Sequence, residues 1–417
     1  MTDPEQQPGR HPGQEPGPQP GLEPGLEPGL QRDSVTHAGY AVLATWAWFL
    51  YGFGAILPLL RAEQGTSRAV LGMHSLALAC GGLIAGGLAV PLVRRVHRRG
   101  AFTVGGLLAA TGVVALTVAP VPALTIAATV LTGTGGSVLL QAAAPSLMDH
   151  HRRFGPAVLS EGNAVAAAVG LVAPLAVWAA TSLGWTWRPA ALVEVPLIGV
   201  LLLLVRRVPA GTAAIDTGLP PRGDQPRKRL VGVFWVFLAL LMACVAIEFC
   251  CAAWSADLLR TRTGMSAGAA SIGVTAVVSG MAVGRFAIGR LALRYTPRQL
   301  LLGALALTAV GWAITWLSTA PGPAVAGLVV IGLGIAGHYP LAASITLGSV
   351  PGQSDQASGA ISIGISSAAG LAPFALGAVA DASSTHTAFL AVPIFVMVAT
   401  TALLISRRSV GPRTAVA

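Results

Sequence analysis

"LLRAEQGTS", at residues 59 to 67, returns as "LLRTRTGMS" at residues 258 to 266, an offset of 199 residues. The offset holds far beyond this stretch, and chance does not keep two sequences in register over such a length. At the same separation several landmark residues pair: Gly81 with Gly280, Arg95 with Arg294, Gly133 and Gly135 with Gly332 and Gly334, and Pro174 with Pro373. We therefore predict two copies of one structural unit that run in the same direction.

The composition is that of a membrane protein. Hydrophobic residues make up 54% of the 417 residues and charged residues only 10%, which does not describe a soluble surface. About 20 consecutive apolar residues suffice to cross a hydrocarbon core as a helix. Twelve such stretches follow one another, and we predict an all-α membrane protein with spans at residues 39–60, 69–92, 101–119, 121–146, 158–183, 188–206, 231–258, 267–290, 298–319, 322–347, 356–381 and 386–406.

The segments outside these spans define the domain organisation. Residues 1–36, which include "GLEPGLEPGL", are too rich in Pro and Gly to fold and are predicted to be a disordered cytoplasmic tail rather than a cleavable signal peptide. The longest break between spans is polar and basic, and it separates six helices from six. The predicted parts are therefore a first bundle at 37–206, a cytoplasmic linker at 207–230, a second bundle at 231–406 and a cytoplasmic tail at 407–417.

The net charge of +10 raises the possibility of nucleic-acid binding, which the positions of the charges exclude. With both termini in the cytoplasm, 21 of the 26 Lys and Arg residues lie on the inner side. Such asymmetry is the positive-inside pattern of membrane proteins. We expect a multi-pass protein in the plasma membrane, the inner membrane of a bacterium, with its partners being the lipid bilayer, protons and a small solute.

The duplicated six-helix unit resembles the major facilitator superfamily. That family carries G-x-L-x-D-R-x-G-R-R between its second and third helices, and the matching stretches here read "VPLVRRVHRR" (90–99) and "GRLALRYTPR" (289–298). The acidic position is occupied by Arg94 in one copy and Leu293 in the other. The resemblance implies the major facilitator fold, two pseudo-symmetric six-helix bundles with a solute site between them. It also implies gating loops that contain Arg95, Arg98, Arg99, Arg294 and Arg298.

Glu248 is a charged residue in an otherwise apolar span. No charged residue lies between Leu230 and Ile247, and none follows Glu248 until Asp257. A carboxylate at the bilayer centre costs about 2.5–3.5 kcal/mol, so it needs a task or a partner. Its helical neighbours are small or weakly polar, as a cavity wall requires: Cys244, Cys251, Ala252 and Ser255. We interpret Glu248 as a proton carrier or solute ligand; the alternative is a neutral or paired structural acid.

Two further stretches resemble the fucose-permease-like sugar transporters. Glu248 is followed six residues later by Trp254, and "GLGIAGHYPLAAS" (332–344) contains Tyr339. Asn163 stands at that group's polar position, eleven residues before Pro174. The resemblance implies that Trp254, Tyr339 and Asn163 contact a sugar-like solute. Other aromatic residues available to stack against a solute are Trp46, Trp48 and Tyr51.

Two basic side chains in the second bundle have alternative interpretations. His338 is a proton partner or hydrogen-bond donor to the solute, or else a satisfied packing residue. Arg285 contacts an anionic solute, or it extends toward the cytoplasm with Arg290. The sequence leaves both pairs of alternatives open.

Motifs of other protein classes are missing or lie in the wrong context. "GLGIAG" (332–337) fits a dinucleotide fingerprint but lies inside an apolar span, where small residues serve helix packing. The sequence has no Walker motif and no H-E-x-x-H, so we expect no enzyme, no cofactor and no metal site. We predict a monomeric secondary active transporter, a symporter that moves a small polar organic solute, sugar-like by resemblance, with protons. The alternative is efflux, by a proton-driven exporter of drugs or secondary metabolites.

Overall fold

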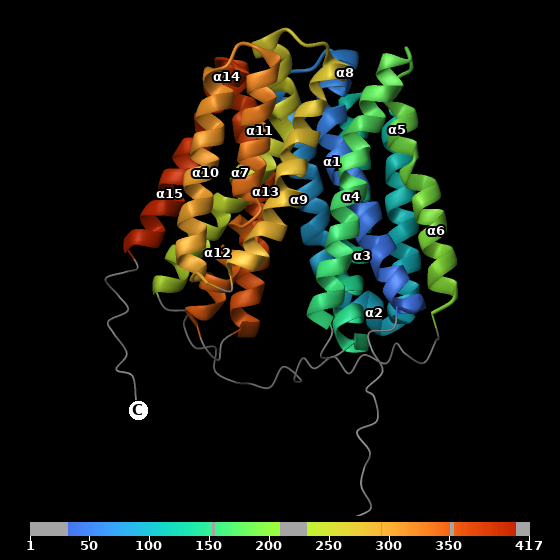
Figure 1. Ribbon diagram of the computed structural model, residues 1–417. Helices are drawn as coiled ribbons and strands as arrows, with labels where there is room; N and C mark the ends of the chain where they lie inside the picture. Colours follow the sequence, from blue (N-terminus) through green and yellow to red (C-terminus); the bar gives the residue numbers. More distant parts are fainter. Residues whose placement is uncertain (1–31, 152–154, 209–231, 293, 351–353, 406–417) are drawn as a thin grey trace, which may run out of the picture.

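The computed structural model describes residues 32–151, 155–208, 232–292, 294–350 and 354–405 (Figure 1). Within these ranges the chain forms helices and connections and no strand. Twelve helical segments are long and apolar enough to cross a membrane, which confirms the predicted number and the all-α fold class. The predictions for the N-terminal tail, the linker and the C-terminal tail fall almost wholly outside the described residues.

The first half of the chain contains six spans. Its helices are α1 (Ser34–Gln64), α2 (Arg68–Val118), α3 (Pro122–His151), α4 (Gly155–Ser182), α5 (Arg188–Leu192) and α6 (Glu194–Arg206). α2 holds two spans, Arg68–Leu88 and Arg95–Val118, and its backbone leaves the helical conformation at His97, where φ is 58°. α1 begins five residues before the predicted residue 39, because Asp33 caps its N-terminus by accepting hydrogen bonds from the backbone of Val35 and Thr36.

The second half repeats this plan with more interruptions. Its helices are α7 (Gly232–Thr263), α8 (Ala267–Ala270), α9 (Ile272–Leu291), α10 (Pro297–Leu317), α11 (Pro321–Ile335), α12 (His338–Gly348), α13 (Ser354–Ala382), α14 (Thr385–Ala388) and α15 (Ala391–Ile405). The predicted span at 322–347 is divided between α11 and α12, which meet at Gly337.

The sequence repeat reappears as a repeat of helix contacts. A Cβ atom placed on Gly81 would lie 2.6 Å from the Val130 carbonyl oxygen, and one on Gly280 would lie 2.1 Å from that of Val329. Both members of the second pair are offset from the first by 199 residues. The repeated glycines are therefore places where helix backbones touch, as expected for membrane helices that associate by close packing. The glycines of "GLGIAG" have this role: Gly332 approaches α9 and Gly334 approaches α10.

The two halves meet at one end and separate at the other (Figure 1). We call the end at which α6 terminates and α7 begins the linker side; in Figure 1 it is the lower end, where the two groups of helices stand apart. Direct backbone contacts between the halves lie toward the opposite side. A Cβ on Gly54 of α1 would be only 2.3 Å from the Ala252 carbonyl oxygen of α7, and one on Gly72 of α2 would be 2.8 Å from the Phe374 Cα of α13.

Candidate functional site

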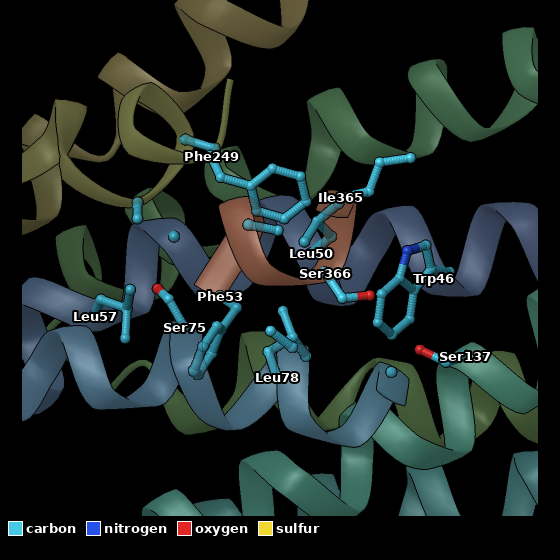
Figure 2. Close-up of a pocket in the computed structure, with 16 residues that line it drawn as sticks. Trp46, Leu50, Phe53, Leu57, Ser75, Leu78, Ser137, Phe249, Ile365 and Ser366 are labelled. Carbon is cyan, nitrogen blue, oxygen red and sulfur yellow. The ribbon is translucent and has the colours of Figure 1, made fainter. Parts of the chain in front are cut away.

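A cavity of about 150 Å³ lies between the two halves (Figure 2). We call it the central cavity. One wall comes from α1, α2 and α3 of the first half, and the other comes from α7 and α13 of the second. The side chains that line it and are labelled in Figure 2 are Trp46, Leu50, Phe53, Leu57, Ser75, Leu78, Ser137, Phe249, Ile365 and Ser366.

The helical repeat explains this lining. Trp46, Leu50, Phe53 and Leu57 recur every three or four residues of α1 and so share one face of the helix. Apolar and aromatic groups dominate the wall, as in most small-molecule sites.

The polar groups of the cavity are a few hydroxyls and one indole. Ser137 and Ser366 come from opposite halves, and both hydroxyls lie within 4.0 Å of the position a Cβ on Gly82 would take. Figure 2 shows them near the Trp46 indole. Hydroxyls donate and accept hydrogen bonds, so this end of the cavity can orient a polar group of a bound molecule.

Glu248 lies beside the central cavity, on a neighbouring face of α7. It is half-buried and interacts electrostatically with Arg285 of α9, Tyr51 of α1 and Tyr339 of α12. The structure thus brings together three residues that the sequence predicted separately, and it adds Tyr51, which the sequence offered only as a stacking aromatic. We call these four residues the Glu248 group. Because Tyr51 belongs to the first half, the group spans the boundary between the halves.

Three predicted solute contacts lie elsewhere in this conformation. Trp254 is 1% exposed, and its indole N–H donates to the Pro373 carbonyl oxygen over 3.0 Å, so it joins α7 to α13 instead of facing the cavity. His338 is fully buried and does not line the central cavity; its Nε2 lies 3.2 Å from the Thr308 hydroxyl of α10. Asn163 is exposed, and its side-chain amide donates to the Leu159 carbonyl of its own helix.

Two other polar residues of the spans bind within the first half. Trp48 is buried and donates to the Ala190 carbonyl oxygen over 3.0 Å. Glu161 accepts hydrogen bonds from Arg32 and from the Tyr40 hydroxyl, so it joins α4 to the start of α1.

Two of the predicted gating arginines form hydrogen bonds within their own half. The Arg99 guanidinium donates to the Arg206 carbonyl at the end of α6, and the Arg298 guanidinium donates to the Leu403 carbonyl near the end of α15. Arg99 and Arg298 are repeat partners, separated by the offset of 199 residues. Each ties its basic segment to the last helix of its own half. Arg95 and Arg294, another pair of repeat partners, are exposed, while Arg98 lies half-buried in α2.

Several polar contacts between the halves form a cluster that the sequence did not predict. Asp257 of α7 is fully buried, and its Oδ2 accepts hydrogen bonds from Arg68 Nε over 3.1 Å and from the Thr385 hydroxyl over 2.6 Å. Arg61 lies 3.7 Å from its other carboxylate oxygen. Asp381 of α13 accepts from the backbone N–H groups of Arg68 and Ala69, over 2.7 and 2.6 Å. We call these residues the Asp257 cluster.

The Asp257 cluster closes the side opposite the linker. Arg61 and Arg68 stand at the end of α1 and the start of α2, while Asp257, Asp381 and Thr385 stand at the matching ends of α7, α13 and α14. The sequence does indicate that oppositely charged residues gather at the span ends on one side of the membrane. Which of these residues form ion pairs depends on which helices are neighbours, and a prediction of spans does not identify neighbouring helices.

Comparison with known proteins identifies the architecture. Residues 236–416 match the family model of the Major Facilitator Superfamily. This match by sequence covers the second half of the chain. Solved structures support the fold: the xylose transporter XylE from E. coli, in a partially occluded inward open conformation, has a TM-score of 0.71 at 13% identity, with 91% of this chain and 99% of that one covered.

Solved structures of transporters of other solutes have a similar fold. The nucleoside transporter NupG has a TM-score of 0.68 at 11% identity, covering 89% of this chain and 98% of its own. The peptide transporter POT in complex with sulfate has a TM-score of 0.71 at 16% identity, covering 90% and 95%. No curated protein sequence matches the chain. The twelve candidate spans and the fold shared with these structures are those of a multi-pass membrane protein.

Proposed function

We propose that this chain is a secondary active transporter that moves a small organic solute by alternating access, coupled to protons. The observation that carries the proposal is the contrast between the two ends of the boundary between the halves. The Asp257 cluster fastens one end, whereas the helices stand apart at the linker side (Figure 1). A cavity lies between these ends, and rocking of the halves would expose it to each side in turn.

The Glu248 group is the proposed coupling site. Glu248 and Arg285 carry opposite charges that attract each other, so protonation of the carboxylate would remove this attraction. Tyr51, which belongs to the first half, interacts with both members of this pair. A change in the charge of Glu248 would therefore change an interaction between the halves and so shift their relative position. A charged group inside a membrane protein is expensive, and placement beside a cavity is typical of proton pathways.

The wall of the central cavity bears on the class of solute. Resemblance to sugar permeases implies a sugar-like solute, which would need many hydrogen-bonding partners. The wall offers the hydroxyls of Ser75, Ser137 and Ser366 among mainly apolar side chains. This lining favours an amphipathic molecule with an apolar body and a small polar end. It supports the second candidate function, proton-driven export of drugs or secondary metabolites.

The charge distribution supports an orientation. We propose that the protein acts as a monomer in the plasma membrane. We also propose that the linker side faces the cytoplasm, because most of the Lys and Arg residues outside the spans belong to the segments on that side. In this orientation the structure is closed toward the outside.

Flux through proteoliposomes tests the proposal. A panel of sugars and amphipathic compounds is first screened by thermal shift, since a ligand that prefers the folded state raises its stability. Hits are then assayed for accumulation under an imposed pH gradient. Glu248→Gln should abolish gradient-driven accumulation and retain counterflow exchange, whereas the control Glu161→Gln, on α4 with Arg32 and Tyr40, should leave both unchanged.

The same assay separates the outcomes. Saturable flux of sugars alone would support the symporter, and flux of amphipathic compounds alone would support the exporter. Accumulation by Glu248→Gln at the wild-type level would remove the coupling assignment. Ligand binding without any flux would overturn the transporter proposal as a whole.

A further inference from the structure

A group of possible metal ligands lies at the linker side of the first half, outside the sites described above. Asp33 caps the N-terminus of α1, while His150 and His151 belong to the last turn of α3. One ligand atom from each of the three side chains lies within 4.8 Å of the other two. We call these residues the Asp33 site. Asp33 precedes His150 by 117 residues, so no short motif marks the site, and we expected no metal from the sequence.

Short contacts bring the three side chains together. Asp33 Oδ2 lies 2.6 Å from His150 Nε2, and the two imidazole rings meet edge to face with their centroids 4.8 Å apart. Consecutive residues of a helix point about 100° apart, so the helix alone does not explain why these rings converge. Thr36 is fully buried; its hydroxyl donates to Asp33 Oδ1 over 3.0 Å and lies 2.7 Å from His151 Nε2. Thr36 thus orients a side chain of each helix, as outer-shell groups do in metal sites.

The spacing of the side chains suits a tetrahedral metal ion. Ligands that are about 2.0–2.2 Å from a zinc ion lie about 3.4 Å from one another, so the side chains of the Asp33 site would have to shift by only about 1 Å. The side chains of Asp33 and His150 are 42% and 29% exposed, so both have room to turn and an ion can reach them from the solvent. Two imidazoles and one carboxylate favour zinc and similar transition metals over Mg²⁺ and Ca²⁺, which prefer oxygen ligands alone.

The surroundings of the site also suit a cation. The C-terminus of α3, which carries both histidines, is the negative end of a helix dipole. Arg32, next to Asp33, is paired with Glu161 over 2.9 Å, so its charge is offset. We propose that the Asp33 site binds a divalent transition-metal ion of the zinc class, with water as a further ligand, and that the ion joins the start of α1 to the end of α3. All three ligands belong to the first half, so this proposal does not rest on the proposed transport cycle.

The experiment measures zinc binding to the purified full-length protein, which must carry no polyhistidine tag. Isothermal titration calorimetry gives the affinity and the stoichiometry for Zn²⁺, with Mg²⁺ as the comparison. We expect saturable binding of a single zinc ion per chain, no comparable binding of Mg²⁺, and a higher melting temperature with zinc, because zinc would bind only the folded state. Co²⁺ serves as a spectroscopic probe, and its visible absorption should be that of a four-coordinate ion.

Variants identify the ligands. His150→Ala and His151→Ala should each weaken zinc binding about tenfold or more, since even the loss of an outer-shell group costs about 10–100-fold. Asp33→Asn should weaken it as well, and because Asn is also a good N-cap residue, this variant keeps α1 capped. The matched control is His37→Ala: His37 is exposed on α1 one turn after Asp33 and lies outside the site, so this variant should bind zinc like the wild type.

Three results would overturn the proposal. If zinc does not bind, the three side chains serve only as hydrogen-bonding contacts between α1 and α3. Equal binding of Mg²⁺ and Zn²⁺ would show an unselective surface carboxylate. Wild-type zinc affinity in His150→Ala and in His151→Ala would place the ion elsewhere, and either variant remains informative if the other does not fold.

Discussion

The carboxylate of Asp257, in the second half, accepts a hydrogen bond from Arg68 Nε, in the first half, over 3.1 Å. The same oxygen accepts from Thr385, and no part of the Asp257 side chain is exposed. Removing one partner of a buried ion pair leaves an uncompensated charge and costs about 3–5 kcal/mol. This pair is therefore a main determinant of how firmly the halves close on the side opposite the linker. The repeat supplies no counterpart, because Asp257 corresponds to Pro58.

Asp381 accepts hydrogen bonds from the first two backbone N–H groups of α2, across the boundary between the halves and beside the N-cap residue Ser67. Its removal should loosen the same closure more weakly, because loss of capping hydrogen bonds costs about 1 kcal/mol, or roughly a fivefold change in an equilibrium. In a chain whose four native cysteines are replaced, Asp381→Ala should raise several-fold the rate at which an impermeant maleimide labels Ser366→Cys from the side opposite the linker. Ser266→Ala removes a cap within the second half and should not change that rate. Equal labelling in both variants would contradict the role of Asp381.

A substitution at Gly54 tests how closely α1 of the first half packs against α7 of the second. A Cβ there would lie 2.3 Å from the Ala252 carbonyl oxygen, a backbone atom of the other half, so the helices must move apart. Overpacking of this kind costs about 1–3 kcal/mol. Gly54→Ala should lower the melting temperature and slow solute exchange. Gly52→Ala, whose Cβ would meet the Ala173 Cβ at 3.4 Å within the first half, should behave like the wild type. The close approach is disproved if the two variants match.

Replacement of Trp254 should change the stability of the protein, whereas replacement of Trp46 should change its affinity for the solute. Trp254→Phe removes a buried donor and leaves the Pro373 carbonyl without its partner, at a cost of about 1–3 kcal/mol. We expect a lower melting temperature and a transport KM within twofold of the wild-type value. Trp46 lines the central cavity, so Trp46→Phe should raise KM several-fold. A raised KM for Trp254→Phe would contradict this interpretation and would indicate that Trp254 contacts the solute.

Asp33 predicts a pH dependence of stability outside the membrane spans. Burial raises the pKa of its carboxyl, but the hydrogen bonds from Thr36 and His150 together lower the pKa by more than burial raises it. The pKa of Asp33 therefore lies below its ordinary value of 3.8. The ionised form therefore stabilises the fold fully above pH 3.8, and this stabilisation is lost as the pH falls through the lower, folded-state pKa. The difference in melting temperature between the wild type and Asp33→Asn should shrink as the pH falls from about 4 to 2, where the His150 imidazole bonded to Asp33 stays protonated. A difference that grows as the pH falls below 4 would refute this account.

The sequence was sufficient for the number of spans and for the duplication. Both depend on local features: the length of apolar stretches, and glycines such as Gly81 and Gly280 that allow backbones to touch. The presence of Glu248 in a span also marked that residue as unusual without any knowledge of its neighbours.

Tertiary relationships were beyond the sequence. The direction in which His338 and Trp254 point depends on the rotation of their helices, and both turn into contacts within the second half. The pairing of Arg68 with Asp257 joins residues 189 positions apart, and that of Ala69 with Asp381 joins residues 312 positions apart. Such pairs are fixed by which helices are neighbours, a property that hydropathy does not encode.

The most direct test of the central claim is a pair of distances measured by spin labels in lipid nanodiscs. Labels at Ala62 and Ser383 report the separation of the halves beside the Asp257 cluster, and labels at Val96 and Tyr295 report it at the linker side; all four residues are exposed. Asp257→Asn should lengthen the first distance and shorten the second. Glu63→Gln breaks an ion pair with Arg188 inside the first half and should change neither. If Asp257→Asn leaves both distances unchanged, or moves both in the same direction, closure of the halves around Asp257 is not part of an alternating-access cycle.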